Sequence, residues 1–278
     1  MTPKILPQKE DNRPIGVFDS GIGGLIALTA LAKALPQEDL VYLGDTARVP
    51  YGDRSPEIVK NYARECVQFL LDHSVKLIVV ACNTVSAIAL SEIEKISPVP
   101  VIGVIKPAVS AVSAVLLTPG YKKIGIIGTR VTVQSRSYEH EIYKIHGQAG
   151  LLIYAQACPL FVPLIEEGWH EDPFIYPVAE KYLRPLKEEK IDALILGCTH
   201  YPLLRKVIEE IMPGVVLIDP AEEATKQTVQ IIQQYASQNA YKERQIECYV
   251  TDLAPTFVRM VNQFLGVSPE AIRHVSIG

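Results

Sequence analysis

The chain of 278 residues lacks an excess of either charge and any long apolar run. Its 27 Lys and Arg residues are balanced by 31 Asp and Glu residues, whereas duplex-DNA binders usually carry a basic stripe. The longest apolar stretch, residues 75–90, is interrupted by polar side chains and falls short of the roughly 18 residues that a membrane-spanning helix needs. Residues 1–13 are polar and contain no apolar segment of a signal peptide. The sequence therefore predicts a cytoplasmic protein that binds neither nucleic acid nor membrane.

Cysteine is scarce, and its pattern excludes two classes of small protein. The chain has five cysteines, which are Cys66, Cys82, Cys158, Cys198 and Cys248. Their number is odd, they are widely spaced, and none forms a Cys-x-x-Cys motif. This pattern fits neither a disulfide scaffold nor the common zinc ribbons, so we expect free thiols and no metal site.

The glycine-rich motifs of nucleotide cofactors are also missing. Residues 19–24 have the sequence Asp-Ser-Gly-Ile-Gly-Gly after a predicted strand, but their glycine spacing is not that of the dinucleotide-binding fingerprint, and no P-loop Lys-Ser/Thr follows. The glycines permit a tight turn in which backbone N–H groups bind a carboxylate or phosphate. Alternatively, the segment is an ordinary strand-to-helix turn with Asp19 or Ser20 as the helix cap. Under both interpretations no nucleotide cofactor is predicted.

The sequence does contain a regular alternation of short apolar runs and longer amphipathic stretches. Continuous runs of 4–6 apolar residues are typical of strands that are buried on both faces of a parallel sheet. The predicted strands are 15–18, 40–43, 77–81, 101–104, 123–127, 151–155, 193–196, 215–218 and 245–250. The predicted helices are 55–73, 86–96, 133–146, 174–189, 201–212 and 220–236. This alternation predicts an α/β fold with mostly parallel sheets.

Two pairs of similar segments indicate an internal repeat. Segment 15–20 resembles 124–129, and 77–84 resembles 194–200, at nearly the same separation along the chain. Open α/β sheets bind ligands at the carboxyl ends of their strands. We therefore predict two similar three-layer α/β domains with the active site in the cleft between them.

The repeat also sets the predicted domain boundaries. Residues 1–13 are expected to form a flexible tail. Residues 14–106 together with 219–278 form the first predicted domain, and 107–218 form the second. The last segment of the chain is thus expected to return and pack on the first domain.

Both copies of the repeat place a cysteine at the end of a strand, before a helix. The segments are Cys-Asn-Thr at 82–84 and Cys-Thr-His at 198–200. The positive end of a helix dipole favours the thiolate and lowers the pKa from the value of about 8.5 in free cysteine. His200 could also orient or reprotonate the thiol two residues before it. The alternative is that both cysteines are small buried residues, as most free cysteines are, and this is our interpretation of Cys66, Cys158 and Cys248.

Two further segments carry polar residues whose role the sequence alone leaves open. Loop 44–52 has the sequence Gly-Asp-Thr-Ala-Arg-Val-Pro-Tyr-Gly, and its Arg48 and Tyr51 face either a ligand or solvent. Stretch 160–169 carries two acids, of which Glu166 is the first. Without further context these acids are interpreted as exposed carboxylates at a helix end.

Four motifs in this order resemble those of the glutamate racemase family, which is part of the cofactor-independent aspartate/glutamate racemase superfamily. They are the segments 19–24 and 44–52, Ala-Cys-Asn-Thr at 81–84, and Gly-Cys-Thr-His-Tyr-Pro-Leu at 197–203. The resemblance extends from about residue 14 to about residue 262, with Val85 standing where an alanine is usual. It implies an isomerase that supplies D-glutamate for peptidoglycan, and hence for cell-wall biogenesis and cell shape.

The resemblance implies a mechanism that uses no cofactor. Without pyridoxal phosphate as an electron sink, racemisation needs one base on each face of Cα. By resemblance, Cys82 takes the proton from D-glutamate, and Asp19 assists it. Cys198 takes the proton from L-glutamate, assisted by His200 together with Glu166.

The resemblance also implies how the substrate is held. Hydroxyl, amide and backbone N–H donors bind the two carboxylates without a buried Lys or Arg. The implied binding residues are Asp19, Ser20, Tyr51, Gly52, Asn83, Thr84, Thr199 and His200. Thr129 is added because it occupies in the second half the position of Ser20 in the first. The family further implies a homodimer and, in some members, activation by a cell-wall precursor nucleotide.

Other functions remain open at this point. A sister racemase that acts on aspartate or another acidic amino acid would differ in pocket depth, which the sequence does not give. A non-catalytic two-domain module that binds a small molecule would need no paired thiols. A thiol redox protein is disfavoured because the chain has no Cys-x-x-Cys motif.

Overall fold

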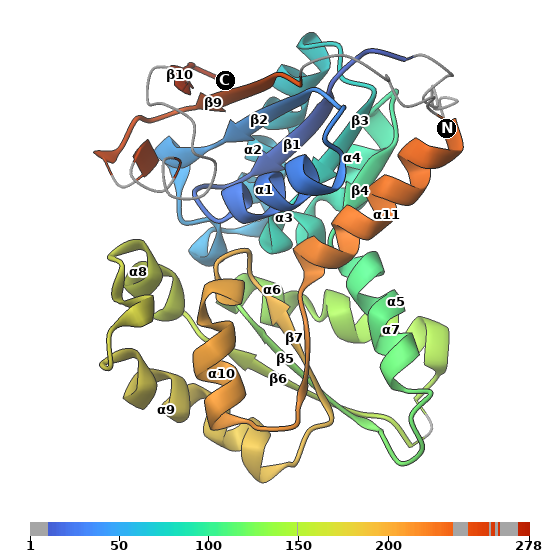
Figure 1. The fold of residues 1–278 in the computed structure, drawn as a ribbon, viewed down its shortest axis with the longest axis vertical. Coiled ribbons are helices and arrows are strands. Elements are labelled where there is room, and N and C mark those ends of the chain that lie inside the picture. Colours follow the sequence, from blue (N-terminus) through green and yellow to red (C-terminus); the bar gives the residue numbers. More distant parts are fainter. Residues whose placement is uncertain (1–10, 149, 236–243, 256, 259–260, 262–271) are drawn as a thin grey trace.

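The computed structural model describes residues 11–148, 150–235, 244–255, 257–258, 261 and 272–278, which form two α/β domains stacked one above the other (Figure 1). Each domain contains one sheet in which all paired strands run parallel, as the sequence predicts. Most of the predicted tail 1–13, and the end of the resemblance near residue 262, lie outside the described residues. None of the described helices is long and apolar enough to cross a membrane.

The first domain is built on a six-stranded sheet with the order β10-β9-β2-β1-β3-β4. Its strands are β1 (Ile15–Asp19), β2 (Leu40–Gly44), β3 (Leu77–Val80), β4 (Val101–Gly103), β9 (Ile246–Val250) and β10 (Ile272–His274). The helices α1 (Gly24–Ala34) and α11 (Pro220–Tyr235) cover one face, and α2 (Pro56–Asp72) packs on the other. The last strands of the chain therefore extend the edge of the first sheet beside β2.

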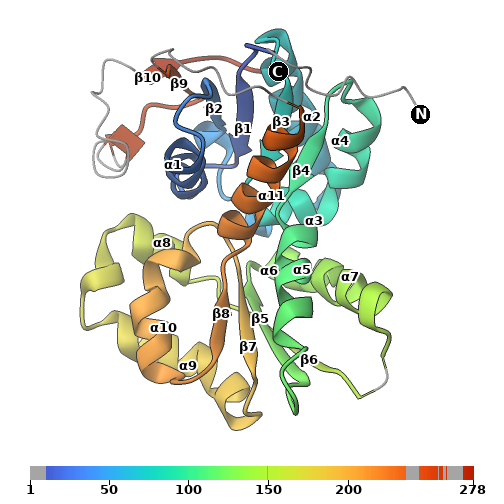
Figure 2. The ribbon, with the colours of Figure 1, turned by 45° about the vertical axis from the view of Figure 1, so that its right-hand side comes forward.

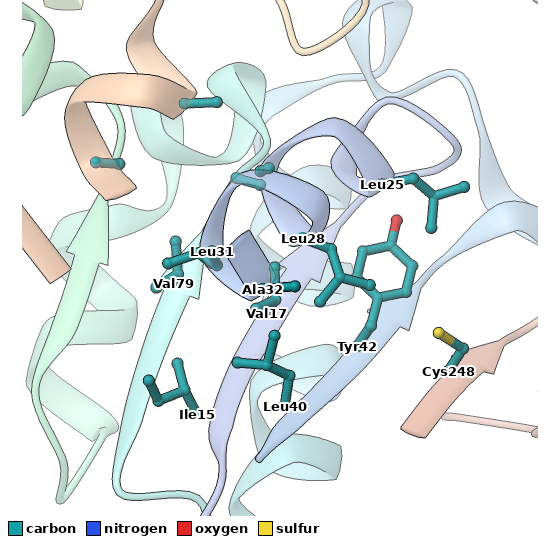
Figure 3. Close-up of a cluster of buried hydrophobic side chains, with 14 of the residues drawn as sticks. Ile15, Val17, Leu25, Leu28, Leu31, Ala32, Leu40, Tyr42, Val79 and Cys248 are labelled. Carbon is teal, nitrogen blue, oxygen red and sulfur yellow. The ribbon is translucent and has the colours of Figure 1, made fainter. Parts of the chain in front are cut away.

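The side chains of β1 show why its apolar run is continuous. Ile15 and Val17 pack against Leu28 and Leu31 of α1, in the cluster drawn in Figure 3. Phe18 points to the opposite face and joins the cluster under α2. Because helices cover both faces, every residue of this strand is buried, and no polar alternation is needed.

The second domain is built on a four-stranded sheet with the order β6-β5-β7-β8. Its strands are β5 (Lys123–Gly128), β6 (Leu152–Ala157), β7 (Ala193–Gly197) and β8 (Val216–Ile218). The helices α5 (Ile105–Val115) and α7 (Ser137–His146) pack on one face. The helices α8 (Phe161–Glu166), α9 (Ile175–Glu188) and α10 (Arg205–Ile211) lie on the other, as Figure 2 shows.

Strand order reverses at one point in each sheet, and the two points are equivalent. In the first sheet β2 pairs with one side of β1 and β3 with the other. In the second sheet β6 and β7 flank β5 in the same way. Crevices outside the carboxyl ends of such strand pairs are the usual ligand sites of open α/β sheets. The repeat seen in the sequence therefore corresponds to two equivalent crevices, one in each domain.

The predicted strands are all present, with ends that differ by one or two residues, but two helices begin earlier than predicted. The predicted helix 86–96 consists of α3 (Asn83–Ile88) and α4 (Leu90–Ile96). The predicted helix 133–146 consists of α6 (Arg130–Ser135) and α7, which are separated by Arg136 at a φ of 54°. The earlier starts place Asn83 and Arg130 in the first turns of the helices that face the other domain.

Helices, rather than extended linkers, connect the two domains. The predicted boundary at residues 106 and 107 lies inside α5, whose apolar face packs on Ile124 and Ile126 of the second sheet. On the return crossing, α11 packs against both α1 and α5 (Figure 1). The division of the chain into 14–106 plus 219–278 and 107–218 stays a prediction.

Candidate active site

A cavity of about 310 Å³ lies between the two domains, at the carboxyl ends of the two equivalent strand pairs. The predicted site residues that line it are Ser20, Tyr51, Gly52, Cys82, Asn83, Thr84, Thr129, Glu166, Cys198, Thr199 and His200. Asp19 lies behind Ser20 and is fully buried. The fold thus brings residues from both halves of the sequence to one cavity.

On the first-domain side, Cys82 follows β3 and precedes α3. Its side chain is almost buried, and its Sγ lies 3.4 Å from the Oγ of Ser20. Burial, with a smaller contribution from the nearby Asp19 carboxylate, raises the pKa of the Cys82 thiol to about 12. The expectation that the helix N-terminus lowers this pKa is therefore wrong, because the amide contact from Val85 does not offset the loss of solvation. At neutral pH Cys82 is therefore a thiol.

Asp19 ends β1 and is oriented by the glycine turn that follows it. Its Oδ2 accepts hydrogen bonds from the N–H groups of Gly21, at 3.0 Å, and Gly24, at 2.9 Å. Its Oδ1 is buried and has no hydrogen-bond partner within the described chain. Burial raises the pKa of Asp19, although these amides and His200 oppose the shift. A β-carbon at position 24 would lie 2.2 Å from the Asp19 Cβ, so only glycine fits there.

On the second-domain side, a carboxylate, an imidazole and a thiol form a chain of two contacts. The Sγ of Cys198, directly after β7, lies 3.8 Å from the Nδ1 of His200. The Nε2 of the same ring lies 3.1 Å from the Oε1 of Glu166, at the end of α8. Sequence alone favoured a solvent-exposed Glu166, whereas the structure shows it contacting a buried imidazole.

The environment of His200 favours its protonated form. Burial opposes the charge, but the contacts to the Cys198 sulfur and the Glu166 carboxylate outweigh it and raise the pKa of His200 to about 10. At neutral pH the ring is therefore an imidazolium that lies between a sulfur and a carboxylate. A cation at this place is a counter-ion for a thiolate at Cys198.

Replacing Glu166 with glutamine is expected to lower the pKa of His200 by about one pH unit, because an opposite charge at this distance is worth about 1–3 units and Glu166 is partly exposed. The raised pKa of His200 stabilises the folded protein. This stabilisation is fully present below about pH 6.5, the pKa of histidine in the unfolded chain, and it is lost as pH rises through about 10, the pKa in the folded protein. The variant should therefore lose stability at pH 7 and little at pH 11. Imidazole titration by NMR and urea unfolding at both pH values measure this.

Glu167→Gln is the matched control, since Glu167 is adjacent and exposed and belongs to no hydrogen bond with His200. It should leave the titration of His200 unchanged. If both variants shift that titration equally, the specific Glu166–His200 contact is not its cause.

A group of threonine hydroxyls joins the two domains across the cavity. The Oγ1 of Thr84 in α3 lies 3.1 Å from that of Thr129 and 3.3 Å from that of Thr132. Thr129 also caps α6, because its Oγ1 accepts the N–H of Thr132. The two domains are thus in contact through these hydroxyls, and those of Thr84 and Thr129, which line the cavity, can turn their protons toward a ligand.

The loop 44–52 is fixed by a buried carboxylate. Asp45 accepts the hydroxyl of Tyr51, the Nε of Arg48 at 2.6 Å and the hydroxyl of Thr251 at 2.8 Å. The Tyr51 hydroxyl thus donates its proton to Asp45 and not to a ligand, so Tyr51 presents its backbone and ring to the cavity. Arg48 pairs with Asp45 and Glu65 instead of facing a ligand.

Sequence analysis missed part of the cavity wall. Arg130 and Asp53 form an exposed ion pair of 3.2 Å at the domain junction, and Val162 and Pro163 of α8 add apolar surface. The sequence did contain a signal for Arg130, because this residue directly follows Thr129, which the repeat makes equivalent to Ser20. The apolar wall had no such signal, because α8 is too short to show a periodic pattern.

Three comparisons with known proteins agree with this geometry. Residues 25–228 match the Asp/Glu/Hydantoin racemase family. The glutamate racemase of Geobacter metallireducens is 43% identical over 267 residues, which are 95% of this chain and 97% of that protein. The structure of glutamate racemase from Francisella tularensis in complex with D-glutamate has a TM-score of 0.87 and 39% identity, and covers 95% of this chain and 98% of that one. The structure of Escherichia coli glutamate racemase with L-glutamate and the activator UDP-MurNAc-ala has a TM-score of 0.75 and 26% identity, and covers 96% of this chain and 99% of that one.

Proposed function

The chain belongs to the Asp/Glu/hydantoin racemase family, and on this premise we propose that it is a glutamate racemase whose two thiols interconvert L- and D-glutamate. The main support is that Cys82 and Cys198, which follow equivalent strands of two domains, line one cavity. Structures of similar racemases with D-glutamate and with L-glutamate support the choice of substrate.

The proposed reaction moves one proton to Cα and one proton from it. With L-glutamate, the Cys198 thiolate takes the Cα proton, and the Cys82 thiol gives its own proton to the opposite face. The C–H electron pair stays on Cα during the step and forms the new C–H bond. The reaction ends with a thiol at Cys198 and a thiolate at Cys82, ready for the reverse direction.

The protonation states of Cys82 and His200 fit the start of this reaction. A Cys82 pKa of about 12 keeps that residue a thiol, as the acid requires. The imidazolium of His200 lies beside Cys198, which has to be the thiolate. In the reverse direction, the buried carboxylate of Asp19 supports proton transfer at Cys82 from its place behind Ser20.

Polar groups of both domains would hold the substrate. Glutamate carries two carboxylates and one ammonium group, and the cavity offers hydroxyl, amide and backbone donors from Ser20, Asn83, Thr84 and Thr199. Their positions on opposite sides of the cavity would keep Cα between the sulfurs, and exclusion of water would strengthen these contacts.

We further propose the setting that the resemblance implies. The enzyme acts in the cytoplasm as a homodimer and supplies D-glutamate for peptidoglycan. A cell-wall precursor nucleotide is its expected activator, and the support is that Escherichia coli glutamate racemase was solved with the activator UDP-MurNAc-ala.

The proposal is tested by incubating the purified protein with L-glutamate in D2O. We expect the circular dichroism signal to decay toward that of the racemate, while deuterium enters Cα. L-Aspartate in a parallel reaction should be turned over far more slowly. Binding of glutamate without deuterium incorporation would instead show a binding module, and faster turnover of aspartate would show a sister racemase.

A further inference from the structure

Tyr138 of α7 contacts the segments that carry both cysteines, although it belongs to no motif that the sequence singled out. Its hydroxyl donates a hydrogen bond of 2.6 Å to the Oδ1 of Asn83, the residue after Cys82 in the other domain. Its ring packs beside Gly197, the residue before Cys198, where an added Cβ would lie 3.4 Å from the Tyr138 Cε2. Only 1% of Tyr138 and 3% of Asn83 is exposed.

In this hydrogen bond the Tyr138 hydroxyl donates and the Asn83 Oδ1 accepts. Burial raises the pKa of the Tyr138 phenol well above its usual value, so the hydroxyl keeps its proton at physiological pH. With Oδ1 as its acceptor, the Asn83 amide places its nitrogen on the side away from Tyr138. A rotated amide would present an oxygen there and repel a carboxylate.

The Asn83 nitrogen is left available to a ligand. Asn83 lines the cavity, and within the described part of the chain its Nδ2 has no hydrogen-bond partner. Among the described residues, the side-chain atoms that are both buried and without a partner are the Oδ1 of Asp19 and the Nδ1 of His170. The Asn83 nitrogen has no partner and is not one of these buried atoms, so it reaches the surface of the cavity. Two N–H donors at this place suit a carboxylate.

Resting on the proposed function, we propose that Tyr138 is a positioning residue whose hydroxyl holds the Asn83 amide with its N–H groups toward a carboxylate of the substrate. The ring of Tyr138 is anchored in the apolar core under α7, with Ile126 and Ile195 of the second sheet. The second domain therefore orients a binding group of the first domain.

Tyr138→Phe tests this inference, because it removes the hydroxyl and keeps the ring. We expect KM to rise about three- to tenfold for both enantiomers, the range that a neutral hydrogen bond supplies. kcat should stay within about twofold, because the contact to the carboxylate exists in the bound substrate and in the transition state alike. Tyr249→Phe in β9 removes the hydroxyl of another buried tyrosine, which donates a hydrogen bond of 2.5 Å to Glu247, and it should keep the wild-type KM.

A double-mutant cycle separates this role from a merely structural one. If Tyr138 acts through Asn83, then Asn83→Ala with and without Tyr138→Phe should have the same KM. Glutamate affinity from calorimetry should follow the same pattern, and urea unfolding of each variant verifies that it is folded. A Tyr138→Phe enzyme with the wild-type KM, or effects of the two substitutions that multiply, would overturn the inference. A wild-type protein that does not racemise glutamate would overturn the proposed function instead, and the binding data would still test Tyr138.

Discussion

Replacing Cys82 or Cys198 with alanine is expected to lower the interconversion of L- and D-glutamate by at least about 10²–10⁴-fold, the range that one general acid–base group supplies. In the proposed cycle each thiol acts once as a base and once as an acid, so either replacement stops both directions. The decay of the circular dichroism signal of each enantiomer measures the loss.

The two variants should differ in the half-reaction that survives. Cys82→Ala keeps the base for L-glutamate, which can lose its Cα proton and regain one on the same face. This variant should therefore exchange the Cα proton of L-glutamate with D2O without inversion. Cys198→Ala should do the same with D-glutamate alone. Loss of the Cα proton signal in NMR spectra of each enantiomer distinguishes the two variants.

Cys248→Ala is the control for these replacements. Cys248 is also a fully buried free thiol, but it lies in the core of the first sheet beside Tyr42 (Figure 3). Its replacement should keep wild-type turnover and lower only the free energy of unfolding. A Cys198→Ala enzyme with wild-type turnover, or a Cys82→Ala enzyme that exchanges D-glutamate, would contradict the two-thiol mechanism.

The fold was predictable because its information is local. Continuous apolar runs such as Leu77–Val80 occur where helices cover both faces of a strand, and the sequence shows both the runs and the helices between them. The strand ends were predictable for the same reason, and with them the places of Cys82 and Cys198. The short α8 was missed because it contains too few residues for a periodic pattern, and β10 was missed because Arg273 and His274 are polar and exposed, so the strand forms no apolar run.

The electrostatics of the site were less predictable, because they depend on contacts between distant segments. A helix N-terminus predicted a lowered pKa for Cys82, but the thiol is buried in the folded protein, and this burial raises the pKa. The partner of His200 is 34 residues away in sequence, and the resemblance, rather than any spacing, suggested it. What the sequence leaves out is thus the set of contacts between distant segments, on which the burial of Cys82 and the charge of His200 depend.

Replacing Gly23 with alanine should lower kcat by about 100-fold, because the added methyl group would clash with residues of the other domain. Gly23 precedes α1 with φ −60° and ψ −27°, a conformation that alanine adopts readily, so the backbone does not oppose the change. An added Cβ would lie 2.3 Å from the Oγ1 of Thr199 and 2.7 Å from the Nδ1 of His200, both in the other domain. The methyl group therefore has to displace the side chains of Thr199 and His200, which line the cavity beside Cys198, and a displacement of about 1 Å can cost about 10²-fold in rate.

Gly16→Ala is the matched control in the same segment. A Cβ there would lie 3.1 Å from side-chain atoms of Leu70 and Val75, inside the first domain. It should cost about 1–3 kcal/mol of stability through overpacking and leave kcat near the wild-type value. Gly23→Ala should show the opposite pattern, with near-normal unfolding in urea and little turnover, because the methyl group separates two folded domains and does not disturb either core. If Gly23→Ala keeps wild-type kcat, the closed contact between the turn at Gly23 and the turn at Thr199 is not needed for catalysis.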